Sequence, residues 1–313
     1  MKQASQQANQ VKHCQIWLGV LLLFALGISV FADESVPCPS YGRPSSIATI
    51  ADDRLTEISG LVSGQSQPGI LWVHNDSGDA AVVYAIDLEG QLLVKVQLVS
   101  SDGSKINAVD CEDIALGSGP SGGDFLYLAD IGDNTSSRES IRIYRFREPT
   151  FNADANGRVV QVTVECDVME AVYPDSARDA ETLLVDPISG DLVIVSKDFI
   201  HARAYRMSDT IGEASTLEFL VELPWGFMTG GDISPDGSNI LLRGYWNAEI
   251  WSRSAGTNWW MMLALPGCPA PLALESQGEA IGFRESGTGY LTVSEGYQPM
   301  LHSYRLELDE PAD

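Results

Sequence analysis

A pattern of three short strands occurs five times in this 313-residue chain and constrains the fold more than any other feature. Residues 111–148 show it clearly, as CEDIAL, DFLYLAD and IRIYRF separated by Gly, Ser, Asn and Asp turns. Each run is rich in β-branched and aromatic residues and is bounded by turn formers, as strands are. The first strands of the five repeats are expected at residues 57–62, 111–116, 180–186, 231–237 and 278–283.

A fourth strand is expected in four of the repeats, with the sequences LLVKVQLV, VVQVTVEC, LEFLVEL and WWMMLAL. The last repeat has none, but the isolated segment SIATIAD before the first repeat can supply it. Four-stranded repeats of about 50 residues predict a β-propeller. We therefore expect an all-β, five-bladed β-propeller whose ring is closed by the N-terminal strand. The long interval between Glu112 and Glu181 leaves room for a sixth blade.

The N-terminal 32 residues differ from the rest of the chain. Lys2, Lys12 and His13 precede the apolar run IWLGVLLLFALGISVF, which ends near the small residue Ala32. This order predicts a Sec signal peptide, and the alternative is a retained membrane anchor. We expect a signal peptide at 1–32, a linker at 33–42 and one propeller domain at 43–313, exported to the periplasm or the medium.

The cysteines and the charge agree with an exported protein. Loss of Cys14 with the signal peptide would leave an even number of cysteines, which predicts two disulfides. We expect Cys38–Cys268 and Cys111–Cys166, with buried free thiols as the alternative. The formal net charge of −24 would repel phosphate backbones, so we expect no nucleic-acid partner. Once the signal peptide is removed, we expect no membrane contact.

Acidic residues gather where one face of the propeller is expected. The start of a blade's first strand and the end of its second lie on the same face. The residues at these places are Glu57, Glu112, Glu181, Asp232 and Glu279 at the starts, and Asp76, Asp79, Asp130, Asp133, Lys197, Arg243 and Glu295 at the ends. Hard cations prefer such carboxylate oxygens, so we predict calcium as the cofactor. The predicted ligands are Asp76, Asp79, Asp130, Asp133, Glu57 and Glu112.

The same acids have a structural interpretation, because an acid at the start of every inner strand can anchor neighbouring blades. For ligand binding we single out Lys197, Arg243, Trp246 and Tyr297. The catalytic candidates are Glu112, Glu181 and His74, and none belongs to a zinc motif, a dinucleotide motif or a P-loop.

The motifs CEDIALG, LADIGDN, IYRFREP, AETLLVDPISGDL and DISPDG resemble those of a family of exported bacterial β-propellers with no established activity. Members of that family have Trp where this chain has Cys111. The chain is more distantly similar to the "esterase-like activity of phytase" propellers and the calcium-dependent β-propeller phytases. That similarity implies calcium held by carboxylates, with Lys197 and Arg243 contacting phosphate.

Two functions follow from these features. The first is a calcium-supported module that binds a small molecule, a glycan or a protein partner at an acidic, aromatic-rimmed mouth. The alternative is a hydrolase of phosphoesters or glycosides that uses the same carboxylates. A scaffold whose acids only anchor the blades is a third interpretation.

Overall fold

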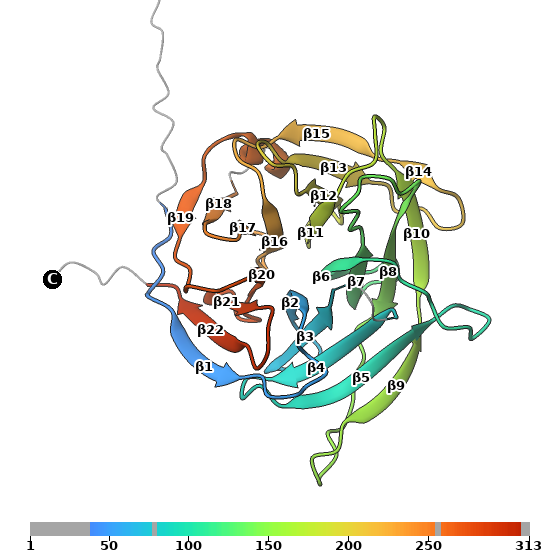
Figure 1. The fold of residues 1–313 in the computed structure, drawn as a ribbon, viewed down its shortest axis with the longest axis vertical. Helices are drawn as coiled ribbons and strands as arrows, with labels where there is room; N and C mark the ends of the chain where they lie inside the picture. The colour runs from blue at the N-terminus through green and yellow to red at the C-terminus, as the bar shows by residue number, and fades with distance from the viewer. Residues whose placement is uncertain (1–37, 77–79, 254–257, 308–313) are drawn as a thin grey trace, which may run out of the picture. The chain divides into compact units, whose positions relative to one another are not determined.

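The computed structural model describes residues 38–76, 80–253 and 258–307, which form five small sheets arranged in a ring (Figure 1). The protein is therefore an all-β, five-bladed β-propeller, as the repeats predict, and the described residues contain no sixth blade. The predicted signal peptide, residues 33–37 of the predicted linker and the predicted metal ligand Asp79 lie outside the described residues.

The first two blades each have five strands. Blade one contains β2 (Ile58–Ser63), β3 (Ile70–Asn75), β4 (Val82–Asp87), β5 (Leu92–Val99) and β9 (Val160–Glu165). Blade two contains β6 (Cys111–Ser118), β7 (Asp124–Asp130), β8 (Ile141–Arg147), β10 (Asp167–Val172) and β14 (Ser215–Thr216). In both blades the innermost strand is the first in sequence, so β2 and β6 face the axis of the ring.

The remaining blades have four strands each. Blade three contains β11 (Ala180–Val185), β12 (Leu192–Ser196), β13 (Arg203–Met207) and β15 (Glu218–Glu222). Blade four contains β16 (Met228–Ile233), β17 (Asn239–Gly244), β18 (Ala248–Ser252) and β19 (Cys268–Ala270). Blade five contains β20 (Gly278–Phe283), β21 (Gly289–Ser294), β22 (Met300–Arg305) and β1 (Ser45–Thr49).

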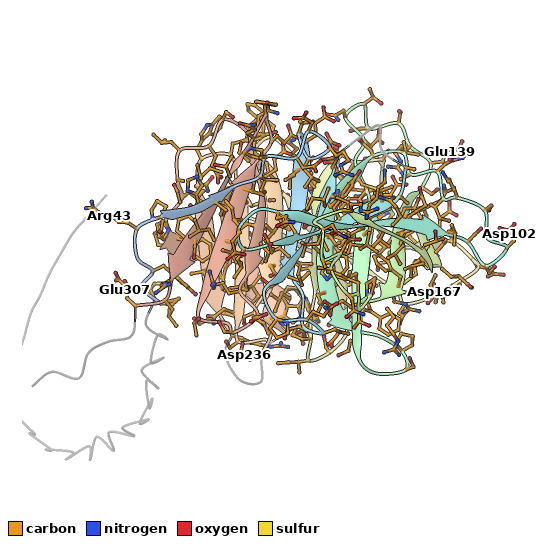
Figure 2. All side chains as sticks on the ribbon, turned by 90° about the horizontal axis from the view of Figure 1, so that it is seen from below. Arg43, Asp102, Glu139, Asp167, Asp236 and Glu307 are labelled. Atoms are coloured by element: carbon orange, nitrogen blue, oxygen red, sulfur yellow. A yellow bond between two sulfur atoms is a disulfide. The ribbon has the colours of Figure 1, made fainter. Side chains whose placement is uncertain are left out.

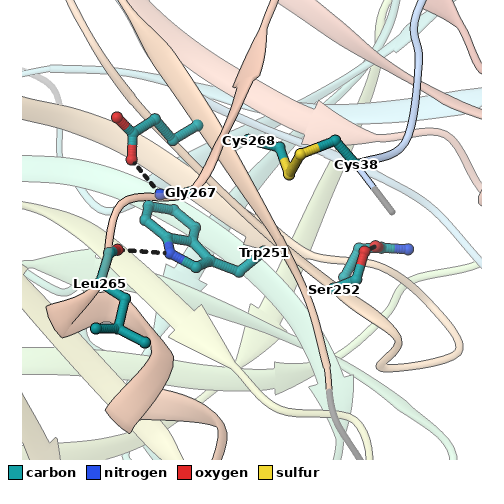
Figure 3. Close-up of a disulfide and its surroundings, with 8 residues drawn as sticks. Cys38, Trp251, Ser252, Leu265, Gly267 and Cys268 are labelled. Atoms are coloured by element: carbon teal, nitrogen blue, oxygen red, sulfur yellow. Dashed lines mark hydrogen bonds between the residues drawn. A yellow bond between two sulfur atoms is a disulfide. The ribbon is translucent and has the colours of Figure 1, made fainter. Parts of the chain in front are cut away.

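The ring is closed as predicted, by the N-terminal strand. β1 pairs antiparallel with β22, from Ser45 opposite Ser303 to Thr49 opposite Met300. The disulfide Cys38–Cys268 joins the segment before β1 to the start of β19, which confirms this predicted pair (Figure 3). The segment entering β19 is fixed further by the Trp251 indole N–H, which donates to the Leu265 carbonyl at 2.9 Å.

The second predicted disulfide is wrong, because Cys111 and Cys166 are both free thiols. Both are buried in the hydrophobic cluster that includes Val62, Trp72 and Leu128, from blades one and two. A buried thiol packs like a small apolar side chain, and these two fill space in that cluster. Burial raises the pKa of both thiols, that of Cys166 to about 12.

The segment VVQVTVEC was expected as the fourth strand of blade two, and this prediction is wrong. Its strand, β9, pairs in parallel with β5 and so adds an outer strand to blade one. The fourth strand of blade two is β10, aligned on β8 by cross-strand ion pairs of Asp167 with Arg145 and of Glu170 with Arg142. The extra strand explains the long interval between Glu112 and Glu181 without a sixth blade.

The segment WWMMLAL was expected as a strand and instead forms the 3-10 helix η1 (Trp259–Ala264). Trp259 and Leu263 lie four residues apart and are both buried, in a cluster with residues of blades three and four. In a strand, Trp259, Met261 and Leu263 would share one face, but Met261 is 60% exposed, so the burial pattern does not fit a strand. The fourth strand of blade four is the short β19, which pairs with β18.

Candidate metal centre at the channel mouth

A bulge interrupts each of the five innermost strands near its beginning. The pairing register shifts across one residue in β2, β6, β11, β16 and β20, and those residues are Ser59, Glu112, Glu181, Thr229 and Glu279. A bulge leaves the extra residue unpaired and redirects its side chain. All five bulges lie near the beginnings of the innermost strands and therefore at the same end of the ring. The loop between β7 and β8, where Figure 2 labels Glu139, lies at this end too.

The ring is less symmetric than the sequence suggested. Glu112, Glu181 and Glu279 occupy bulges, but the other two expected acids do not. Glu57 lies two residues before the Ser59 bulge and is exposed, and Asp232 lies three residues after the Thr229 bulge and is buried. The expected alignment of these two acids is therefore wrong.

The two remaining bulges carry hydroxyl groups that are used structurally. Ser59 Oγ donates to the Glu112 carbonyl at 2.7 Å, and Thr229 Oγ1 donates to the Gly278 carbonyl at 3.1 Å. Both bonds join one blade to the next. A fivefold ring of anchoring acids therefore does not exist, and the three glutamates need a separate explanation.

Two groups of three carboxylates lie at this mouth. Asp76, after β3, and Asp110, before β6, form one group with Glu112. Asp179, before β11, and Glu181 form a second group with the same Glu112. In each group the three ligand oxygens lie within 4.8 Å of one another. Glu112 therefore belongs to both groups.

Lys197 pairs with Glu181, which belongs to the second group alone. Its ammonium pairs with Glu181 Oε1 and lies 5.1 Å from the centre of the Tyr245 ring. Burial lowers the pKa of Lys197, but Glu181 outweighs it and holds that pKa above its ordinary value. Glu181 Oε2 is buried and has no hydrogen-bond partner among the described residues. One oxygen of the second group is thus still available to a ligand.

Burial and mutual repulsion raise the pKa values of these acids. The pKa of Glu112 is raised to about 11, mainly by burial and then by repulsion from Glu181 and Asp76. Burial and the neighbouring Asp76 raise the pKa of Asp110 to about 6. Burial raises the pKa of Glu181 to about 9, against the effect of Lys197. Without a cation, this mouth would hold protons at neutral pH.

A further acidic pair, Glu279 and Glu295, lies beside the two groups. Burial raises the pKa of both, that of Glu295 to about 8 with repulsion from Glu279 as the next cause. Tyr245 Oη donates to Glu279 Oε1 at 3.2 Å, and Gln277 donates to Glu295 Oε2 at 2.7 Å. Tyr245 therefore contacts both this pair and Lys197.

Gly132 lies directly against the first acidic group. A Cβ atom added at Gly132 would overlap Glu112 Oε1 and would lie 2.6 Å from Asp110 Oδ2. Glycine is needed here for this close approach of the backbone. The DIGD segment, residues 130–133, thus contributes to the site through its glycine.

The two aspartates of that segment serve the fold. Asp130 is fully buried and accepts hydrogen bonds from the Val109 and Asp110 amides and from Tyr144 Oη, and it pairs with Arg138. Asp133 is buried and accepts the Arg138 amide at 2.7 Å. Their oxygens hold the loop after β7, and neither aspartate belongs to either acidic group, so the structure gives no support to the prediction that they are metal ligands.

Two other predicted residues are buried away from solvent. Arg243 is 0% exposed, and it pairs with Glu275 at 2.8 Å and donates to the Ala280 carbonyl. His74 is also fully buried, with Nδ1 2.9 Å from the Asn75 carbonyl. Neither side chain reaches solvent, so Arg243 does not contact a phosphate at the surface and His74 does not act as a base at the mouth.

The predicted aromatic residues do lie at the surface. Trp246 is 81% exposed and Tyr297 is 72% exposed. Trp246 belongs to an aromatic rim that also contains Phe199, Phe227 and Tyr245, with neighbouring ring centres 4.7–6.5 Å apart. Because Tyr245 also contacts Lys197 and Glu279, the rim is continuous with the acidic mouth.

The sequence analysis did not single out Asp110 and Asp179, which the structure places in the two acidic groups. Each precedes a bulged glutamate by two residues, in the segments Asp110-Cys111-Glu112 and Asp179-Ala180-Glu181. This Asp-x-Glu pattern occurs at two of the five repeat starts and would have identified both groups.

The chain matches no protein-family model, and no curated protein matches it significantly. Within the described residues, no helix reaches the length and hydropathy needed to cross a membrane.

Proposed function

We propose that this propeller binds calcium at Asp76, Asp110 and Glu112, and that the bound cation and the aromatic rim together hold a ligand. The observation that carries the proposal is the position of Glu112, a buried carboxylate shared by two acidic groups. Calcium takes carboxylate oxygens at 2.3–2.6 Å, so two of its ligands lie at most about 5 Å apart. The spacing in both groups meets this limit.

The first group is the better cation site of the two. Lys197 already pairs with Glu181 in the second group, whereas Arg138, which acts on Asp110 in the first group, is held by Asp130. A cation on Asp76, Asp110 and Glu112 would replace the protons that this group otherwise holds. The donors are all oxygen, which favours calcium or magnesium over zinc.

A modest affinity for calcium would suit an exported protein. Extracellular calcium modules have Kd values on the order of 10⁻⁴ to 10⁻³ M, and we expect this site to fall in that range. The ligand would use open positions on the cation and stack on the rim. A small molecule, a glycan or a protein side chain can make both contacts.

The test is thermal unfolding of the protein with calcium and with excess chelator. Calcium should raise the midpoint with concentration, since it binds only the folded state. Glu112→Gln and Asp110→Asn should remove the rise. Gly132→Ala should also remove it, because the added Cβ enters the first group. Glu57→Gln, which neutralises an exposed acid outside both groups, is the matched control and should keep the rise.

One observation favours hydrolysis as a second function. The pKa of Glu181 is raised to about 9 by burial, which suits a general acid at neutral pH. Hydrolysis of p-nitrophenyl phosphate or p-nitrophenyl glycosides in the presence of calcium, lost in Glu181→Gln, would support it. A phosphate substrate would have Lys197 and the cation to contact, because Arg243 is buried.

A further inference from the structure

A cavity lies at the opposite end of the channel from the acidic groups. It has a volume of about 220 Å³ and is lined by residues of all five blades. These residues lie at or just after the ends of the innermost strands, whereas the bulges lie at the beginnings. Asp236, labelled in Figure 2, lies in the turn after β16 on this face.

The wall of the cavity is mixed, with apolar and polar groups in equal measure. Its apolar side chains are Val62, Leu116, Pro187, Ile233, Pro235 and Phe283. The volume corresponds to about seven water molecules at roughly 30 Å³ each. A compact apolar ligand of that size would gain by displacing water from this wall.

Two carboxylates line the same cavity, and among the described residues no Lys or Arg lines it. Asp232 is 8% exposed and rigidly held, because Oδ1 accepts the Ile233 amide at 2.8 Å and Oδ2 accepts the Phe283 amide at 2.7 Å. Each oxygen has a second lone pair for a ligand. The second carboxylate, Asp124, begins β7 and is half-buried.

We propose that this cavity binds a small organic ammonium compound, with its apolar body against the wall and its charge toward Asp232 and Asp124. A carboxylate or phosphate ligand would meet two acids and no compensating cation. A neutral apolar ligand would gain only from the wall. An ammonium group gains charge-assisted hydrogen bonds in a desolvated place, where such bonds are strong.

This site is independent of the proposed calcium site. The two lie at opposite ends of inner strands about six residues long, which is roughly 20 Å at 3.3 Å per residue. Failure of either proposal therefore leaves the other intact.

The test compares three probes that share a six-membered ring: cyclohexylammonium, cyclohexanol and cyclohexanecarboxylate. Isothermal titration should be run at pH 8, above the pKa of Asp232, which burial raises to about 7. We expect the ammonium compound to bind at least tenfold more tightly than the alcohol, and the carboxylate not to bind. Equal affinity for all three, or preference for the carboxylate, would overturn the proposal.

Variants of residues that line the cavity test whether the probes bind there. Asp124→Asn should lower the ammonium affinity severalfold and leave the alcohol unchanged, and Asp232→Asn should do the same if it folds. Ser118→Trp, at an exposed position on the cavity's edge, should block all probes. Glu139→Gln, which removes an exposed acid on the opposite face (Figure 2), is the control and should leave the affinity for every probe unchanged. Ammonium binding that survives both Ser118→Trp and Asp124→Asn would refute the assignment.

Discussion

Glu112→Gln should make the calcium-free protein more stable, and increasingly so as the pH rises. The folded-state pKa of Glu112 is raised from 4.5 to about 11, mainly by burial. For an acid, a raised pKa means that the folded state holds a proton that the unfolded state releases. Below pH 4.5 Glu112 is protonated in both states and does not reduce the stability of the fold. Between about pH 4.5 and 11 the folded state must retain this proton, and stability falls progressively as the pH rises.

The size of the effect follows from linkage. Retaining one proton costs about 1.4 kcal/mol for each pH unit above the unfolded pKa, which gives about 2 kcal/mol at pH 6 and about 5 kcal/mol at pH 8 as upper limits. Glutamine has the same shape and avoids this cost. The advantage of the variant should therefore grow by up to about 1.4 kcal/mol per pH unit.

The assay is urea unfolding in excess chelator at pH 6, 7 and 8, for the wild type, Glu112→Gln and the control Glu57→Gln. Calcium should then stabilise the wild type at pH 8 and leave Glu112→Gln unchanged. A glutamine variant that is less stable than the wild type at pH 8, or whose difference does not depend on pH, would refute the reasoning. Glu112 would then be an ionised anchor held by its neighbours.

Three other changes test the rest of the structure. Cys38→Ser opens a bridge with a sequence separation of 230 residues, so it should cost about 2–5 kcal/mol and lower the unfolding midpoint by roughly 10 °C; equal midpoints would show that β1 alone closes the ring. Cys111 and Cys166 should react with a thiol reagent only on unfolding in non-reducing denaturant, and no reaction there would mean that they form a disulfide after all. Lys197→Met removes the charged hydrogen-bond partner of Glu181 and should cost about 1.5–3 kcal/mol at pH 7, and adding Glu181→Gln should restore most of it; no rescue would mean that Lys197 acts through packing.

The repeat pattern was enough to predict the five blades and the closing strand, because both depend on local strand signals and on their count. The partner of each outer strand was harder to predict. VQVTVE has the pattern of a strand, but whether it joins β5 or β8 depends on which apolar face it covers. The ion pairs that fix β10 on β8 become visible only when the two strands are aligned.

The site was predicted in part. The sequence identified Glu112, Glu181 and Asp76, since acids stand at strand ends that meet on one face. It did not show that the bulge, rather than the first acid of each repeat, sets the alignment, so Glu57 and Asp232 were misplaced. The roles of Asp130 and Arg243 were not predictable either, because their hydrogen-bond partners come from other loops or strands.

The most direct test of the calcium proposal is equilibrium dialysis of the protein against radioactive calcium, with Glu112→Gln and Glu57→Gln in parallel. Calcium should bind saturably to the wild type with a Kd on the order of 10⁻⁴ to 10⁻³ M, should not bind to Glu112→Gln, and should still bind to Glu57→Gln. Absence of binding to the wild type, or equal binding by all three proteins, would contradict the proposal.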